Sequence, residues 1–368
     1  MKKVTDLTDL RGKYVLLRAS LNIPLKDGEV RSCFRLERAL PTMRYLHEQG
    51  AKTIVISHIG REPQETLKPI FTELEKHLPI QWGGSITSSE FQDRKALMQP
   101  GDLLLAENMR QHEGEKANDT DFVATLANQA EYYVNDAFAA VHREHASTFG
   151  VAQKLPAVAG LTLLEEVSEL SKVMQPESPS LFLLGGAKFG TKMPLIEKYL
   201  DVYDQVFIGG ALANDVLKAK GYEIGQSMTS EVSLADAPFL NHEKLLLPID
   251  VTLEGGVIKQ ISDVLPEERI MDCGPETVAM LSAHIHKAKT VLWNGPFGAY
   301  EAGYTFGTED TAKLIAASDA FSVVGGGDTV AAIEKLKLND QLGFVSIGGG
   351  SMLTFLEHGS TTVLDLLT

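Results

Sequence analysis

The sequence predicts an α/β protein made of two doubly wound parallel-sheet (Rossmann-like) domains that face a central cleft and are joined by a helix hinge. Short apolar, β-branched segments alternate with amphipathic helical stretches, which is the pattern of parallel sheets. At 163–174, apolar residues recur at helical intervals until Pro176 and Pro179 follow. The residues after the strands differ in chemistry on the two sides of this stretch, so we expect the domain boundary there.

The chain is expected to divide into four parts. These are a first domain at 1–157, the joining helix at 158–175, a second domain at 176–347, and a C-terminal segment at 348–368 that returns towards the first domain. One large domain that covers the helix is the alternative.

Composition is that of an ordinary globular protein. The 368 residues are 44% hydrophobic and 23% charged, which is enough chain for two domains of typical size. The net charge of -15 argues against a nucleic-acid partner, because a phosphate backbone attracts an excess of Lys and Arg. No apolar run has the length of a membrane span and no signal peptide is apparent. Two distant cysteines, Cys33 and Cys273, are expected to be free thiols in a reducing cytoplasm.

In the N-terminal half, polar or cationic groups follow each predicted strand. Strands are expected at 14–17, 52–56, 103–105 and 132–134. The groups beyond them are Arg18, Ser20 and Asn22, then Ser57, His58 and Arg61, then Glu107, Asn108 and Arg110, and finally Asn135, Asp136, His142, Arg143 and His145. Ligands of open α/β sheets bind at the carboxyl edge, so we expect the arginines to converge on one site, with Arg35 and Arg38 pointing there from a helical stretch.

For any single arginine, a solvated surface charge is the alternative. Repetition at the same topological position in an acidic chain favours a site for a small, multiply anionic molecule, since guanidinium binds carboxylate and phosphate bidentately. His142 and His145 are not expected to bind a metal, because no third ligand accompanies them.

In the C-terminal half, glycines replace the arginines after the strands. Strands at 181–184, 206–208 and 291–293, and two more near 321–324 and 343–346, lead into Gly185–Lys188, Gly209–Gly210, Asn294–Pro296, Gly325–Thr329 and Gly348–Gly350. An edge of this kind suits a nucleotide, whose phosphates accept bonds from backbone N–H groups at turns and helix starts. Ordinary turns are the alternative for either glycine triplet.

Two common phosphate motifs are excluded. The segment GGAKFGTK at 185–192 resembles a P-loop, but Thr191 and Lys192 stand in the reverse order. No G-x-G-x-x-G follows a predicted strand. Lys188 and Lys192 are one helical turn apart and are expected to reach the same phosphate, with an exposed lysine pair as the alternative.

Several longer motifs run in order along practically the whole chain. They are RASLNIP at 18–24, SHIGR at 57–61, AENMRQ at 106–111, NDAFA at 135–139 with HREH at 142–145, GGAKFGTK at 185–192, WNGPFGAYE at 293–301, GGGDT at 325–329 and SIGGG at 346–350. Together they resemble the phosphoglycerate kinase family. The resemblance implies a monomeric, two-domain hinge enzyme of the cytoplasm that transfers a phosphoryl group between 1,3-bisphosphoglycerate and Mg-ADP, giving 3-phosphoglycerate and Mg-ATP.

The resemblance also implies roles for individual residues. The triose would be held by Ser20, Asn22, Arg35, His58, Arg61, Arg110 and Arg143. The nucleotide would be held by Gly186, Lys188, Lys192, Gly209, Gly210, Asn294, Pro296, Glu301, Gly326, Gly327, Asp328 and Thr329, with Glu301 at the ribose and Asp328 at Mg²⁺. Arg35, Lys188, Lys192, Gly349 and Gly350 would act on the transferring group, in line and without a protein nucleophile, when the hinge closes.

The chain departs from the family pattern inside several motifs. The departures are Ser20, where the family has aspartate, and Phe34, Gln111, Thr191, Ala211 and Ile347. They leave two alternatives open: a non-catalytic or regulatory protein that kept the fold, and a kinase of the same fold acting on another small carboxylate.

Overall fold

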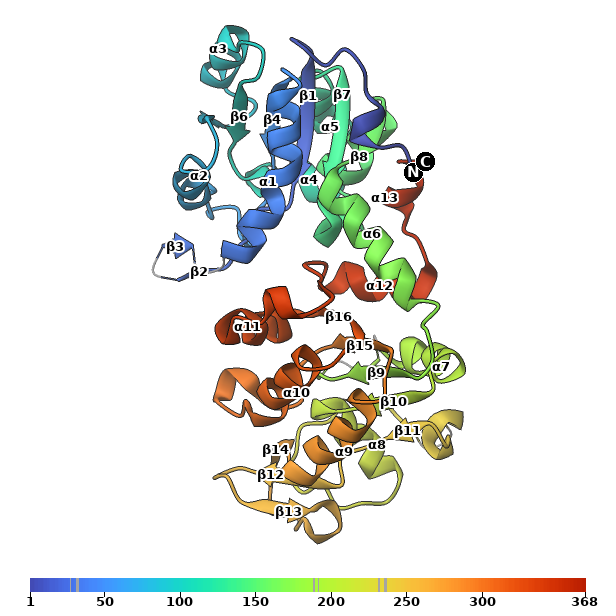
Figure 1. Cartoon of the computed structure of the whole chain (residues 1–368). Coiled ribbons are helices and arrows are strands. Elements are labelled where there is room, and N and C mark those ends of the chain that lie inside the picture. Colours follow the sequence, from blue (N-terminus) through green and yellow to red (C-terminus); the bar gives the residue numbers. More distant parts are fainter. Residues whose placement is uncertain (27, 31–32, 188, 191, 231, 235–236) are drawn as a thin grey trace. The chain divides into compact units, whose positions relative to one another are not determined.

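The computed structural model describes residues 1–26, 28–30, 33–187, 189–190, 192–230, 232–234 and 237–368. The chain divides into two compact units. Unit 1 comprises Met1–Ser168 and Ser360–Thr368, and unit 2 comprises Glu169–Gly359. Each unit contains a six-stranded parallel sheet with helices around it, which confirms the predicted α/β class (Figure 1).

The unit 1 sheet has the order β5-β6-β4-β1-β7-β8. Its strands are β1 (Tyr14–Ala19), β4 (Lys52–Ile56), β5 (Ile80–Gly84), β6 (Leu103–Ala106), β7 (Tyr132–Asp136) and β8 (Ala157–Ala159). Its helices are α1 (Cys33–Glu48), α2 (Lys68–Leu74), α3 (Ser89–Leu97), α4 (Glu113–Ala117), α5 (Thr120–Ala127) and the short α13 (Thr362–Asp365), and a hairpin pairs β2 (Leu25–Lys26) with β3 (Glu29–Val30). Helix α6 (Leu161–Val173) runs from unit 1 into unit 2.

Both faces of this sheet are covered by helices. Alternate residues of a strand point to opposite faces, so Val15 and Leu17 belong to the core under α1 and α2, whereas Leu16 belongs to the core under α3 and α5. Burial on both sides explains why the strands appear in the sequence as continuous apolar runs instead of alternating ones.

The predicted strand at 52–56 is confirmed by β4, but the predicted strand at 14–17 is too short. Strand β1 continues to Ala19, and its Arg18 pairs in register with Ile56 on one side and Asn135 on the other. Strand β7 likewise continues to Asp136. The sequence predicts that each strand ends at its first charged or polar residue, yet the ladder continues through these residues because each neighbouring strand supplies backbone partners.

The unit 2 sheet has the order β11-β10-β9-β15-β16-β17. Its strands are β9 (Ser180–Leu184), β10 (Gln205–Ile208), β11 (Leu245–Leu246), β15 (Thr290–Asn294), β16 (Phe321–Gly325) and β17 (Phe344–Val345). Its helices are α7 (Met193–Val202), α8 (Gly210–Ala219), α9 (Pro275–Ile285), α10 (Phe306–Ala316), α11 (Gly327–Leu336) and α12 (Gly350–His358). A small antiparallel sheet of β12 (Asp250–Leu253), β13 (Ile258–Gln260) and β14 (Ile270–Cys273) lies beside it and was not predicted.

The two chain ends meet on unit 1 (Figure 1). The backbone N–H of Lys2 donates to the carbonyl of Leu367 at 2.7 Å, and Lys3 bridges to Ala159 at the sheet edge. Residues 348–359 thus belong to unit 2, while the last nine belong to unit 1. Among the described helices, none combines the length and apolar character needed to cross a membrane.

Candidate functional site

A cluster of cationic groups lies at the carboxyl edge of the unit 1 sheet. Arg18 is on β1, His58 follows β4, Arg110 lies in a 3₁₀ turn after β6, and Arg143 follows β7. Burial, and then the charges of Arg18, Arg110 and Arg143, lower the pKa of His58. The charge of Arg61 acts in turn on Arg143, whose pKa is lowered first by its own burial. The structure therefore brings together the groups that the sequence distributes over four strand ends.

Arg18 is directed at the protein rather than at solvent. Only 1% of the residue is exposed, and burial lowers its pKa. Its Nη1 donates to the carbonyl of Ala19 at 2.6 Å and to Ser57 Oγ at 3.2 Å, its Nε donates to Ser147 Oγ at 3.0 Å, and its Nη2 lies 2.6 Å from His58 Nδ1. Arg18 thus holds the other groups of the site in place.

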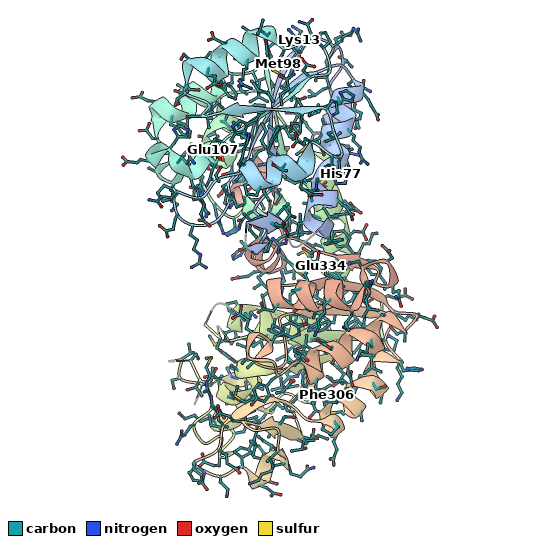
Figure 2. The ribbon with its side chains drawn as sticks, turned by 90° about the vertical axis from the view of Figure 1, so that its left-hand side faces the viewer. Lys13, His77, Met98, Glu107, Phe306 and Glu334 are labelled. Carbon is teal, nitrogen blue, oxygen red and sulfur yellow. The ribbon has the colours of Figure 1, made fainter. Side chains whose placement is uncertain are left out.

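The loop that carries His58 and Arg61 is held by polar residues from neighbouring strand ends. Asn108, fully buried, accepts from the N–H of Ile59 at 3.2 Å and donates to its carbonyl at 3.0 Å. Glu107, labelled in Figure 2, accepts from the N–H of Leu67 at 2.8 Å. Both residues therefore shape the loop instead of presenting their side chains to a ligand.

Further members of the predicted site differ in their exposure and contacts. Asn22 accepts from the N–H of Gly60 at 2.9 Å, and Arg110 Nη1 donates to the carbonyl of the same glycine. The Arg61 side chain is exposed. Ser20 and Arg35 are partly buried, Ser20 just after β1 and Arg35 in the first turn of α1.

The expectation that Arg38 points to the same site is wrong. Its Nη1 forms an ion pair with Glu165 Oε2 at 2.6 Å, across the contact between α1 and α6. Arg35 and Arg38 are three residues apart and therefore leave the same side of the helix. What draws Arg38 away is the carboxylate of Glu165 on α6, which no pattern within 33–48 reveals.

Two half-buried histidines complete the cationic cluster. Burial and the charge of Arg143 lower the pKa values of His142 and His145 to about 4. His142 Nε2 accepts from Arg143 Nε at 3.0 Å, and His145 Nδ1 lies 3.9 Å from Glu115 Oε1. Over the residues that the structure describes, no group of three His, Cys, Asp or Glu side chains could hold a metal.

In unit 2, glycines let three loops pack backbone against backbone at the carboxyl edge of the sheet. The N–H of Gly185 donates to the carbonyl of Asn294 at 2.8 Å, and that of Gly186 donates to the carbonyl of Pro296 at 2.9 Å. A Cβ on Gly185 would lie 2.2 Å from the Pro296 oxygen, and Gly210, at φ +63°, would meet the same oxygen at 2.8 Å. Close loop packing explains these glycines.

A cavity of about 710 Å³ opens beside these loops, within unit 2. Gly186, Gly210, Pro296, Glu301 and Asp328 line it, as does an apolar wall formed by Leu217, Met228, Val251, Ile270 and Met271. A volume of this size suits a ligand as large as a nucleotide. The apolar wall was missed in the sequence because its residues, which come from α8, β12, β14 and the loop at Met228, lie outside the phosphate motifs.

Lys192 places a cation against the glycine-lined loops of unit 2. It is the N-cap residue of α7, is 8% exposed, and donates from Nζ to the carbonyl of Gly185 at 2.5 Å. Burial lowers its pKa to about 8, and the charge of Asp328 opposes this shift. Lys188 and Thr191, both named in the sequence prediction, lie outside the described residues.

The other predicted nucleotide residues lie near the same edge. Asp328 and Thr329 are in the first turn of α11, where Asp328 is partly exposed and Thr329 is fully buried. Gly326 precedes this turn at φ +102°, and no atom within 4 Å would meet a Cβ on Gly327. Asn294 is 3% exposed, and its Nδ2 lies 3.6 Å from Met352 Sδ.

Helix α12 begins at Gly350, the last residue of the second glycine triplet. Gly349 is its N-cap at φ +52°, and no described atom lies within 4 Å of the position that a Cβ would take there. The N–H of Ser351 donates to the carbonyl of Gly348 at 3.0 Å. The other end is held by α7, where Lys198 Nζ donates to the carbonyls of Leu356 and Glu357, each at 2.8 Å. Ile347, a departure from the family pattern, is 2% exposed and packs in the core.

Comparison with known proteins gives a consistent result. The sequence model of the family described as phosphoglycerate kinase matches residues 4–359. A phosphoglycerate kinase of Rubrobacter xylanophilus is 41% identical to this chain, and the match covers 97% of this chain and 95% of the relative. One of Legionella pneumophila is 40% identical, and the match covers 99% of this chain and 96% of the relative. Among solved structures, phosphoglycerate kinase from Coxiella burnetii has a TM-score of 0.84 at 36% identity, covering 99% of this chain and 97% of its own. The enzyme from Pyrococcus horikoshii has a TM-score of 0.87 at 29% identity, covering 100% and 98%.

Proposed function

The chain belongs to the phosphoglycerate kinase family, and we propose that the cationic cluster of unit 1 binds the triose while the glycine-lined edge of unit 2 binds the magnesium nucleotide. The reaction of this family is the reversible transfer of a phosphoryl group between 1,3-bisphosphoglycerate and ADP, which yields 3-phosphoglycerate and ATP. A carboxyl group is the acceptor in the ATP-consuming direction.

The proposed triose site rests on one observation. Four cationic or polar groups lie at the same edge of the unit 1 sheet: His58, Arg61, Arg110 and Arg143. The chain has a net charge of -15, so a small trianionic ligand is attracted only where cations gather locally. Carboxylate and phosphate oxygens match the planar fork of guanidinium. Asn22 and Ser20 would supply uncharged hydrogen bonds beside the cations, and Arg35 would meet the transferring group.

In unit 2, the cavity offers separate places for the base, the ribose and the phosphates of a nucleotide. Its apolar wall would take the base, and Glu301, exposed in a 3₁₀ turn at the cavity, would take the ribose hydroxyls. Lys192 and the N–H groups around Gly186, Gly209, Gly210, Gly326 and Gly327 would bind phosphate oxygens, with Asn294, Pro296 and Thr329 shaping the loops around them.

The residues present fit a magnesium ion bound together with nucleotide phosphates. Mg²⁺ usually takes one or two protein carboxylates and fills its remaining positions with phosphate oxygens and water. Asp328 is a partly exposed carboxylate that lines the cavity, and it would be the protein ligand. When bound, the ion neutralises charge on the phosphate oxygens.

The protein's part in the transfer is positioning and charge compensation, since in-line phosphoryl transfer needs no protein nucleophile. Arg35 and Lys192 would flank the oxygens of the transferring group, and the N–H groups at the start of α12, after Gly349 and Gly350, would donate to them. Because the two ligand sites belong to separate units, transfer would follow closure of the units on both ligands, which also keeps water from the acyl phosphate. We further propose that the enzyme is monomeric and cytoplasmic.

Ligand binding by paired variants tests the division between the units. Arg61→Ala removes an exposed guanidinium that the proposal places on the triose, so 3-phosphoglycerate binding measured by calorimetry should weaken by about tenfold while Mg-ADP binding stays unchanged. Arg94→Ala, which removes an exposed arginine paired with Glu90 on α3, is the matched control. Loss of nucleotide binding in Arg61→Ala would contradict the assignment.

Asp328→Asn tests the proposed nucleotide site of unit 2. Its Mg-ADP affinity should fall by at least tenfold with 3-phosphoglycerate affinity unchanged, because one carboxylate ligand to the ion is lost. Asp319→Asn removes an exposed carboxylate nearby in sequence and serves as control. A substrate panel on the unmodified protein, including other small phosphorylated carboxylates, decides whether Ser20 has changed the preferred acceptor.

A further inference from the structure

We propose that Glu115, Ser147 and Arg18 act as positioning residues that set the tautomer of His58, so that His58 meets the triose as a neutral hydrogen-bond donor through Nε2. This inference rests on the proposed function of unit 1. Neither Glu115 nor Ser147 belongs to a motif that suggested a role in the site, and neither is expected to touch the ligand.

The chain of contacts begins at a buried carboxylate. Glu115, on the short helix α4, is 1% exposed, and its Oε1 accepts from Ser147 Oγ at 2.6 Å while its Oε2 accepts from the Ser147 N–H at 3.0 Å. The hydroxyl proton of Ser147 is thereby committed to Glu115. The hydroxyl oxygen remains free to accept, and it does so from Arg18 Nε at 3.0 Å.

Ser147 itself is held in an unusual turn. Residues Ala146–Gly150 form one π-helical turn, and Tyr133 Oη donates to the Ser147 carbonyl at 2.8 Å. Ser147 and Tyr133 are both fully buried. Single π-turns are frequent at functional sites, and here the turn aims the hydroxyl between a carboxylate and a guanidinium.

At the far end, Arg18 determines which nitrogen of His58 carries the proton. Arg18 Nη2 lies 2.6 Å from His58 Nδ1. A guanidinium has donors only and stays protonated, so Nδ1 must be the acceptor and must lack a proton. The neutral ring then carries its proton on Nε2, because an imidazolium would set two donors against each other.

The Nε2 atom of His58 is at the end of this series of contacts and is available to a ligand. It is buried and has no hydrogen-bond partner among the described residues, although a buried donor without a partner is costly. Burial and the charges of Arg18, Arg110, Arg143 and His145 lower the pKa of His58, which agrees with a neutral ring. A neutral donor binds a carboxylate or phosphate oxygen without adding another charge to the cationic cluster.

Glu115 supplies the negative charge that makes this arrangement possible. Its charge opposes the lowering of the pKa values of both Arg18 and Arg110 that burial causes. Because Ser147 stands between Glu115 and Arg18, removal of its hydroxyl would take the acceptor from Arg18 Nε and break the link to Glu115. The Nη1 bonds to Ala19 and Ser57 would remain, so the guanidinium would lose one of the bonds that fix its orientation towards His58.

Nitrogen NMR of the histidine-labelled full chain tests the proposal on the triose-free protein. In the unmodified protein, His58 should show protonated Nε2 and acceptor Nδ1 from about pH 5 to about pH 8. In Ser147→Ala the His58 signals should move towards a mixture of tautomers, and the KM for 3-phosphoglycerate should rise on the order of tenfold, as when one hydrogen bond to a charged group is lost. The KM for Mg-ATP should stay unchanged.

Glu115→Gln, which keeps the size of the side chain, repeats the test and replaces Ser147→Ala if that variant does not fold. Glu113→Gln, an exposed carboxylate on the same helix, is the control and should behave as the unmodified protein. An unchanged Nε2–H tautomer in folded Ser147→Ala or Glu115→Gln overturns the positioning chain. A different result would overturn the proposed function of unit 1. In that case the tautomer of His58 shifts in Ser147→Ala or Glu115→Gln, yet the affinity for 3-phosphoglycerate stays unchanged in that variant and in Arg61→Ala.

Discussion

Lys192 Nζ lies 2.5 Å from the carbonyl oxygen of Gly185, at the carboxyl edge of the unit 2 sheet. Among the described residues, this carbonyl is the one hydrogen-bond acceptor of a largely buried ammonium. One neutral acceptor compensates the charge less than a phosphate would. Burial therefore lowers its pKa to about 8, and the bond to Gly185 is one that a nucleotide would replace or supplement.

This predicts unusual reactivity of Lys192. A lysine with pKa about 8 exposes a neutral amine as the pH rises through that value, whereas ordinary lysines remain protonated to about pH 10. Modification by an amine-specific reagent at about pH 8.5, located by peptide mass spectrometry, should occur at Lys192 with an appreciable rate and be suppressed by Mg-ADP. Exposed lysines in the same digest are the internal control, and equal protection of all of them would contradict the prediction.

Replacement of Arg35 should affect turnover. Arg35→Ala is expected to lower kcat by on the order of a hundredfold, because a positioned cation on the transferring phosphoryl group is lost. Arg44→Ala removes an exposed arginine from the same helix, α1, and should retain full turnover. Near-normal kcat for Arg35→Ala in the coupled assay with 3-phosphoglycerate and ATP would refute the role.

Ser20→Asp should strengthen triose binding. Ser20 is partly buried just beyond β1, and an aspartate there would accept a hydrogen bond from a triose hydroxyl with a full charge, which is roughly twice as strong as a neutral bond. We expect the KM for 3-phosphoglycerate to fall several-fold, which corresponds to about 1 kcal/mol or less of binding free energy. Ser20→Asn has the same shape without the charge, so an equal KM in the two variants would show that charge is not the cause.

The histidines of unit 1 should make stability depend on pH. His142 and His145 have folded-state pKa values of about 4, below the ordinary 6.5, so the unfolded chain binds more protons between these values. The free energy of unfolding should therefore fall as the pH drops from about 6.5 to about 4, and should vary less above about pH 7. Urea unfolding at a series of pH values across this range measures the free energy of unfolding.

His145→Gln should reduce that slope, because one of the groups that takes up a proton only on unfolding is removed. His77→Gln, at an exposed position after α2 (Figure 2), should leave the slope as it is. An identical loss of slope in both variants would mean that the effect does not come from the cationic cluster.

Much of the fold could be predicted from local patterns. Apolar runs with helical stretches between them predict two parallel sheets, and β4 was predicted to the residue. Strands β5, β8 and β11 were not predicted. Residues after strands were placed at one edge because parallel strands share their direction, and Arg18, His58, Arg110 and Arg143 do lie together.

The errors have a common origin. Arg18 marks the end of an apolar run, yet it lies inside β1 and is fully engaged with Ala19, Ser57, Ser147 and His58. A buried arginine is tolerated only when partners from distant segments satisfy its donors, and no local pattern reveals such partners. Arg38 was expected to point to the cationic site from the same helical stretch as Arg35, but it pairs with Glu165.

The order of residues along this chain is enough to predict two parallel sheets, a cationic edge and a glycine-lined edge, because strand direction and side-chain type are local properties. The Glu115–Ser147–Arg18–His58 chain, the apolar wall of the nucleotide cavity and the loop packing at Gly185 and Gly210 depend on the folded structure. Each of these joins segments far apart in sequence, and hydrogen bonds and burial between such segments exist only once the sheet of their own unit has formed.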